Sequence, residues 1–170
     1  MHIIVDGYNF IGKYSGMIGD IEEKREALIN LLCEYRALKK HDVTVVFDGW
    51  QNGMPNESSE VKRGVRIVFS RLGEKADDVI KRLSVKGQNI IVVSSDKEVS
   101  SYAVNRGAVA LSCTEFEKKL MELTHTEPSD FDAVDKDKEI YSNSITTKKK
   151  GNPRRLSKEE RRKRARISKM

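Results

Sequence analysis

The sequence is poor in cysteine, in aromatic residues and in long apolar runs. Its two cysteines, Cys33 and Cys113, lie far apart inside apolar-periodic segments, and aromatic residues make up only 6% of 170 residues. We therefore expect buried free thiols in a reducing compartment rather than a disulfide framework. No apolar run approaches the roughly 20 residues that span a bilayer. No basic region or long apolar stretch precedes Asp6, so we expect a cytoplasmic protein without a membrane segment.

Charge is distributed unevenly along the chain. The net charge is +6, but the segment from Lys148 to Met170 carries twelve Lys and Arg against two Glu, a net of +10. The part before it therefore carries a net charge of −4. An acidic body with a basic tail is typical of sequence-independent attraction to phosphate backbones. A solvated tail without a partner is the alternative.

Short apolar runs alternate with helical patterns as far as residue 125. Strands are expected at residues 2–5, 43–47, 66–70, 90–93 and 108–111. Helices are expected at residues 21–40, 76–85, 99–105 and 115–123. This alternation predicts an α/β fold with a parallel, doubly wound sheet.

Local signals mark the ends of several of these elements. Asp20 is the expected N-cap of the first helix, and Thr114 with Glu117 forms a capping box for the last one. Residues 51–60 have the composition of a polar loop. We assign residues 1–125 to one domain, and residues 126–170 to a flexible linker followed by a basic tail that is helical over residues 156–167.

Acidic residues recur where the expected strands end. Asp6, Asp48 and Asp96 each follow a strand, and Asp77 and Asp78 open the helix after the third strand. In parallel α/β sheets, ligands bind at the carboxyl ends of the strands. The sequence therefore predicts four or five carboxylates at one rim of the sheet.

Crowded carboxylates repel one another, and a cation relieves this repulsion. Oxygen ligands suit Mg²⁺ or Mn²⁺, whereas scattered histidines and the lack of a cysteine pair disfavour zinc. Each acid also has a structural interpretation when taken alone. Asp6 and Asp48 precede glycine as turn residues do, Asp77 or Asp78 suits a first helical turn, and Asp96 suits an N-cap. Only their joint placement favours a metal site.

Four segments resemble a known family. Residues 3–11, Ile-Ile-Val-Asp-Gly-Tyr-Asn-Phe-Ile, are similar to the start of the NYN domain in its YacP-like branch. Residues 45–49 (Val-Val-Phe-Asp-Gly), 76–80 (Ala-Asp-Asp-Val-Ile) and 92–96 (Val-Val-Ser-Ser-Asp) follow in the expected order. The basic segment 149–160 also looks like the C-termini of some members. The resemblance implies a PIN-like three-layer domain, with a five-stranded parallel sheet whose first strand is central and helices on both faces.

The resemblance also implies a divalent-metal-dependent endoribonuclease. Matched position by position, Asp6, Asp77 and Asp96 would bind Mg²⁺ or Mn²⁺ and act in catalysis, and Asn9 would hold a ligand or water. A metal-activated water would then attack the phosphorus in line and leave 5′-phosphate and 3′-hydroxyl ends. Two further acids are assigned secondary roles, namely Asp48 and Asp78.

RNA, and through the basic tail the ribosome, are the expected partners. The residues expected to contact RNA phosphates are Lys62, Arg63, Arg66, Arg154, Arg155, Arg161, Arg162, Lys163 and Arg164. For the first three, solvated surface charge is the alternative. Tyr8, Tyr14 or Trp50 would stack on unpaired bases, although Trp50 fits an anchor for its loop equally well.

Three other functions compete with this interpretation. A haloacid dehalogenase-type phosphatase needs a second Asp two residues after the first, where this chain has Tyr8. A dinucleotide binder needs glycines in G-x-G-x-x-G spacing, which the opening motif lacks. The serious alternative is a non-catalytic RNA- or ribosome-binding module of the same fold. Metal dependence separates the two, because only an enzyme of this kind loses activity in EDTA.

Overall fold

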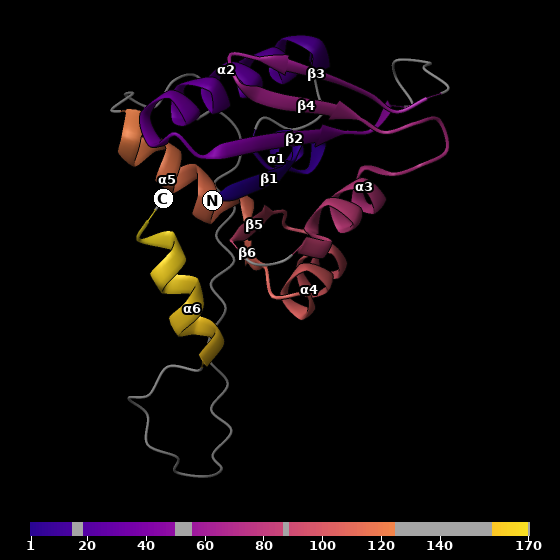
Figure 1. The fold of residues 1–170 in the computed structure, drawn as a ribbon. Coiled ribbons are helices and arrows are strands. Elements are labelled where there is room, and N and C mark those ends of the chain that lie inside the picture. The colour runs from indigo at the N-terminus through magenta and orange to yellow at the C-terminus, as the bar shows by residue number, and fades with distance from the viewer. Residues whose placement is uncertain (15–18, 50–55, 87–88, 125–157, 170) are drawn as a thin grey trace, which may run out of the picture.

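The computed structural model describes residues 1–14, 19–49, 56–86, 89–124 and 158–169. A six-stranded sheet lies between two groups of helices (Figure 1). The strands are β1 (His2–Asp6), β2 (Asp42–Phe47), β3 (Ser58–Lys62), β4 (Val65–Phe69), β5 (Ile90–Val93) and β6 (Val109–Leu111). The helices are α1 (Gly7–Tyr14), α2 (Ile21–Lys39), α3 (Ala76–Leu83), α4 (Lys97–Asn105), α5 (Cys113–Thr124) and α6 (Lys158–Ile167), and a 3₁₀ turn covers Ser84–Lys86.

The sheet has the order β3-β4-β2-β1-β5-β6, with β1 at its centre. β1 pairs in parallel with both β2 and β5. Its side chains alternate between two cores, because successive residues of a strand point to opposite faces. Ile3 and Val5 join the core under α1, α2 and α5, whereas Ile4 joins the core under α3 and α4. The three-layer α/β architecture and the central first strand are thus as expected.

The antiparallel edge strand β3 was not expected. Its residues lie within or just beyond the segment 51–60 that was expected to form a loop, and that expectation is wrong from Ser58 onward. β3 pairs antiparallel with β4 through a tight turn at Arg63 and Gly64, which have φ of 48° and 86°. Its side chains are mostly exposed and all polar except Val61, so the strand has no apolar alternation by which to recognise it.

Helix α1 was not expected, and helices α4 and α5 each begin two residues earlier than expected. The opening motif continues directly from β1 into α1, which the apolar periodicity did not indicate. Helix α5 begins at Cys113, and its capping box is formed by Ser112 and Glu115 rather than by Thr114 and Glu117. The Ser112 N–H donates to Glu115 Oε2 at 2.9 Å, and the Glu115 N–H donates to Ser112 Oγ at 3.2 Å. The N-cap Asp20 of α2 is confirmed, since its Oδ1 accepts the Glu22 N–H at 2.8 Å.

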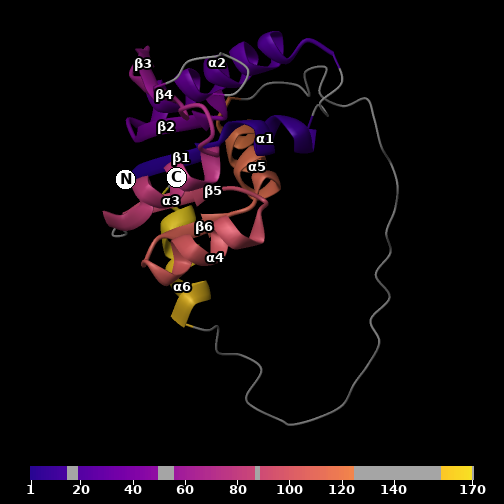
Figure 2. The same ribbon diagram turned by 90° about the vertical axis from the view of Figure 1, so that its right-hand side faces the viewer.

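Helix α6 packs against the edge strand β6 (Figure 2). Arg166 Nη1 donates to the backbone carbonyls of Ile90 and Gly107, both at 3.3 Å, and Ile167 packs against the larger core. The boundary at residue 125 stays a prediction, and the expected linker lies outside the described residues. No helix in the described part of the chain combines the length and apolar character needed to cross a bilayer.

Candidate acid site at the carboxyl edge of the sheet

Asp6 lies at the carboxyl end of the central strand, with 5% of its surface exposed. Its Oδ1 accepts the backbone N–H of Asn9 at 3.2 Å, and its Oδ2 accepts the hydroxyl of Ser94 at 3.1 Å. The pKa of Asp6 is raised to about 6, mainly by burial and in smaller part by the charges of Asp77 and Asp48, against the lowering effect of the two hydrogen bonds. Asp6 is therefore a buried carboxyl group whose ionisation neighbouring acids oppose.

Asp77 approaches the same edge from the first turn of α3. Burial raises the pKa of its carboxyl, and the charges of Asp96 and Asp48 act in the same direction, whereas Lys81 opposes them. Asp48 and Asp77 thus lie within electrostatic reach of Asp6, and Asp48 and Asp96 lie within electrostatic reach of Asp77. Asp78 is exposed on α3, where it contributes to raising the pKa of Lys81.

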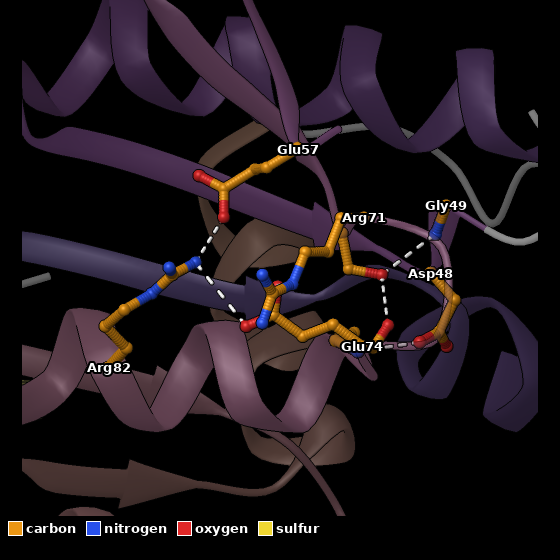
Figure 3. Close-up of polar contacts among 8 residues, drawn as sticks. Asp48, Gly49, Glu57, Arg71, Glu74 and Arg82 are labelled. Atoms are coloured by element: carbon orange, nitrogen blue, oxygen red, sulfur yellow. Dashed lines mark hydrogen bonds and ion pairs between the residues drawn. The ribbon is translucent and has the colours of Figure 1, made fainter. Parts of the chain in front are cut away.

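Asp48 holds the start of α3 in place. Its Oδ1 accepts the backbone N–H of Ala76 at 2.6 Å (Figure 3). The adjacent Gly49 N–H donates to Ser70 Oγ at 3.0 Å, and that hydroxyl donates to the Glu74 carbonyl at 2.6 Å. A Cβ on Gly49 would lie 1.7 Å from the Ser70 carbonyl oxygen, so only glycine fits this close approach. These contacts fix the position of Asp77 one residue after Ala76.

An ion-pair network continues from this point along α3 (Figure 3). Arg82 pairs with Glu57 and, at 3.8 Å, with Glu74, and Arg71 Nε lies 3.3 Å from Glu74 Oε2. The network joins the chain just before β3 to the helix that carries Asp77. No spacing in the sequence signals it, because its members come from three separate segments.

Asp96 is the N-cap of α4. Its Oδ1 accepts the backbone N–H groups of Glu98 at 2.6 Å and Val99 at 3.2 Å. Its own backbone N–H donates to Ser94 Oγ at 3.1 Å. Ser94 therefore links Asp96 to Asp6 through one hydroxyl, a role that was not expected from the sequence.

Asn9 fastens the turn after β5 to the opening motif. Its Oδ1 accepts the Ser95 backbone N–H at 2.9 Å and lies 3.2 Å from Cys113 Sγ. The side-chain carbonyl is therefore engaged by the protein itself. Asn9 positions the segment that carries Ser94 and Asp96, which makes it a positioning residue of this site.

The chemistry of the donor set fits a hydrated divalent cation. Among the described residues, no three His, Cys, Asp or Glu side chains converge closely enough to enclose a metal ion together. Mg²⁺, however, keeps several waters and needs only one or two carboxylates. Asp6 and Asp77, with raised pKa values, are oxygen donors whose repulsion a cation would relieve. Asp48 and Asp96 each have one oxygen committed to backbone N–H groups.

Three basic residues expected to contact RNA lie at the opposite edge of the sheet. Lys62 ends β3, Arg63 lies in the turn to β4, and Arg66 follows at the amino end of β4, level with Thr44 of β2. Lys62 also pairs with Glu26. The hairpin reverses the chain after β3, so these residues lie at the amino edge of the sheet, away from the acids. A direct role for these three residues at the acid site is therefore not supported.

The remaining expected RNA contacts divide between exposed and undescribed positions. Arg161, Arg162 and Arg164 are exposed on α6, whereas Lys163 Nζ lies 2.7 Å from Glu115 Oε1 of α5. Arg154, Arg155 and Trp50 lie outside the described residues. The two expected stacking tyrosines are half-buried: Tyr8 packs on Phe47, with ring centroids 5.1 Å apart, and Tyr14 packs on Phe10 at 4.8 Å.

A family model described as the YacP-like NYN domain matches residues 3–169. The chain belongs to the YacP-like NYN family. The match runs through α6, so the docked C-terminal helix lies within the family's own span. This family consists of nuclease-like domains related to RNA. A group of acids at the carboxyl edge of the sheet agrees with such a family.

Proteins from Bacillus subtilis are similar to this chain. Protein YacP of strain 168 is 30% identical over 122 residues, which cover 66% of this chain and 71% of that protein. A crystal structure of Rae1 (YacP) with a tryptophan-to-leucine substitution superposes with a TM-score of 0.60 at 27% identity, covering 71% of this chain and 75% of that one. A second crystal structure of Rae1 (YacP) gives a TM-score of 0.58 at 27% identity, covering 72% and 74%.

Proposed function

We propose that this YacP-like NYN protein is a cytoplasmic, divalent-metal-dependent endoribonuclease that acts at the acid site. The supporting observation is Asp6, a buried carboxylate at the centre of the carboxyl edge whose pKa is raised to about 6. Burying a charge among like charges is costly unless a cation compensates. Membership of a family of nuclease-like domains also supports the proposal.

Asp6 and Asp77, with the second carboxylate oxygen of Asp96, would hold Mg²⁺ or Mn²⁺ directly or through water. Such a cation supplies an activated water and stabilises charge at a phosphate. The other residues of the site hold these carboxylates in position. Ser94 orients the carboxyl of Asp6 and the backbone of Asp96, and Asp48 fixes the start of the helix that presents Asp77.

The test is cleavage of a labelled structured RNA, and of mRNA on translating ribosomes, with Mg²⁺ or Mn²⁺. We expect Asp6→Asn and Asp77→Asn to abolish cleavage while the fold is retained. Asp42→Asn is the matched control, because Asp42 is an exposed aspartate at the amino end of β2. Cleavage that survives both substitutions, or that persists in EDTA, would contradict the proposal.

The second candidate is a non-catalytic RNA- or ribosome-binding module. It draws on two observations: Asp48 and Asp96 already perform structural tasks, and α6 exposes three arginines. Such a module binds RNA equally well with and without EDTA and cleaves nothing. Comparing association and cleavage in the same buffers therefore separates the two functions.

A further inference from the structure

An open groove of about 390 Å³ lies directly beside the acid site. The turn after β5 and helix α4 form one wall, with Ser95, Lys97 and Ser101. Ser94 also lines the groove, and its hydroxyl donates to Asp6 Oδ2. The groove and the acid site therefore adjoin at Ser94.

The opposite wall is built by α5 and α6. Glu115 accepts the backbone N–H of Ser112 at 2.9 Å and receives Lys163 Nζ at 2.7 Å. Lys163 is held at the groove because α6 itself is docked, with Arg166 bonded to the backbone carbonyls of Ile90 and Gly107. The C-terminal helix thus supplies this wall with an ammonium group, which residues 1–125 alone do not place there.

The lining has a specific chemical character. Serine hydroxyls dominate it, accompanied by Lys97, Lys163 and the paired Glu115, and none of its described lining residues is aromatic or carries a side-chain amide. A hydroxyl both donates and accepts, so it suits the hydroxyls of a ribose as well as phosphate oxygens. Aromatic and amide side chains, which usually read and stack on bases, are missing from this lining.

We propose that this groove binds the ribose-phosphate of a nucleotide next to the scissile bond of single-stranded RNA, and that α6 completes it through Lys163. This inference rests on the proposed function and adds a substrate subsite to it. The volume falls within the range of sites that hold one small ligand, which suits one nucleotide rather than a duplex. The subsite reads the RNA backbone and its 2′-hydroxyl, with no base preference.

The test measures binding of a labelled single-stranded RNA hexamer to the full chain in EDTA, alongside a DNA hexamer of the same sequence. We expect the wild type to prefer RNA, and Ser95→Ala combined with Ser101→Ala to reduce that preference. Lys163→Gln should weaken binding of both oligomers and lower the magnitude of the slope of log K against log salt by about 0.7, with Lys163→Arg restoring it. Lys119→Gln is the matched control, since Lys119 pairs with Glu122 on α5 and does not line the groove.

The outcomes separate this inference from the proposed function. If Lys163→Gln behaves like Lys119→Gln, or if RNA and DNA bind equally well, the subsite is overturned even where Mg²⁺-dependent cleavage is observed. If the expected effects occur in EDTA but no condition gives cleavage, the subsite stands as a binding site and the nuclease proposal fails. Thermal unfolding of each variant checks that the fold is intact.

Discussion

Groups around Asp6 act on its ionisation in opposite directions. Burial and the charges of Asp77 and Asp48 favour the protonated carboxyl, whereas the Asn9 N–H and the Ser94 hydroxyl favour the carboxylate. The result is a pKa of about 6, close enough to neutral pH that a bound cation or a modest change of pH alters the ionisation state. This one side chain therefore has consequences for stability and for metal binding that can be measured separately.

Replacing Asp6 by asparagine should stabilise the fold at pH 7. The folded-state pKa of about 6 lies above the ordinary value of 3.8, so the folded protein holds the proton more tightly between these values. Wild-type stability therefore falls as pH rises through this window, and the penalty is fully present above it. We expect Asp6→Asn to raise the free energy of unfolding by about 1–2 kcal/mol at pH 7. This is less than the free energy that corresponds to the whole pKa shift, because the asparagine amide accepts a weaker hydrogen bond from the Ser94 hydroxyl than the carboxylate does. Urea unfolding at pH 7 and pH 3 measures this, and the gain should vanish at pH 3, below both pKa values.

Divalent cations should reverse the order of stability of these two proteins. A ligand that binds only the folded state stabilises it by about 2.7 kcal/mol at one hundred times its Kd, which exceeds the gain expected from Asp6→Asn. We expect Mg²⁺ or Mn²⁺ to raise the Tm of the wild type at pH 7.5 and to leave Asp6→Asn unchanged, with Asp42→Asn responding like the wild type. An equal rise in all three proteins would indicate nonspecific binding and would argue against a metal at this site.

At the scale of the element, the N-cap of α4 and the acid site share Asp96. Two backbone N–H groups depend on its Oδ1. Asp96→Ala should lower the free energy of unfolding by about 1 kcal/mol, whereas Asp96→Ser should remain near the wild type because serine is also a good cap. If the carboxylate binds the cation, both variants lose cleavage. Unfolding curves and cleavage rates measured together therefore separate the two roles, and a fully active Asp96→Ser would assign Asp96 to capping alone.

Apart from the basic tail helix α6, the elements that sequence patterns predicted are those with strong apolar periodicity. The five parallel strands and α2 to α5 bury continuous apolar faces, so their positions follow from composition and spacing. β3 is mostly polar and exposed, and it forms because β4 offers it a partner, which no local pattern reveals. The hairpin places Lys62, Arg63 and Arg66 at the amino edge of the sheet, and their contact with RNA phosphates stays a prediction.

The same contrast applies to the candidate site. Asp6, Asp48, Asp77 and Asp96 were predicted to gather at one edge because each follows a strand or begins a helix there. The sequence did not predict the hydrogen bonds of the Ser94 hydroxyl and the Asn9 amide, because their partners lie 88 and 86 residues away in sequence. Long-range polar contacts of this kind depend on the finished packing, and a sequence pattern does not encode them locally.

At the scale of the whole molecule, α6 has a docked side and an exposed side. Arg166 and Ile167 attach the helix to β6 and the core, while Arg161, Arg162 and Arg164 are exposed. The attachment and the free positive charge therefore use different residues. The charge can be removed without detaching the helix.

Replacing Arg161, Arg162 and Arg164 together by glutamine should weaken RNA association without changing the Tm. Each phosphate contact to single-stranded RNA contributes about 0.7 to the slope of log K against log salt, so the slope should fall by about 2 in magnitude. Binding measured from low to high salt checks this. A triple glutamine variant at Lys39, Lys118 and Lys119 controls for net charge alone. An equal loss in the control would mean that overall charge, and not α6, attracts RNA.

Because β1 is the central strand, the acid edge can form only after the later strand β5 has been synthesised. Asp6 leaves the ribosome 88 residues before Ser94, and β1 has its parallel neighbour β5 only after that interval. Sheets built from such distant pairings close late, because the intervening loop must form first. A nascent or truncated chain that ends before β5 therefore carries the aspartate without the surroundings that bury and orient it. Assembly of the acid edge thus has to wait for most of the domain to be translated.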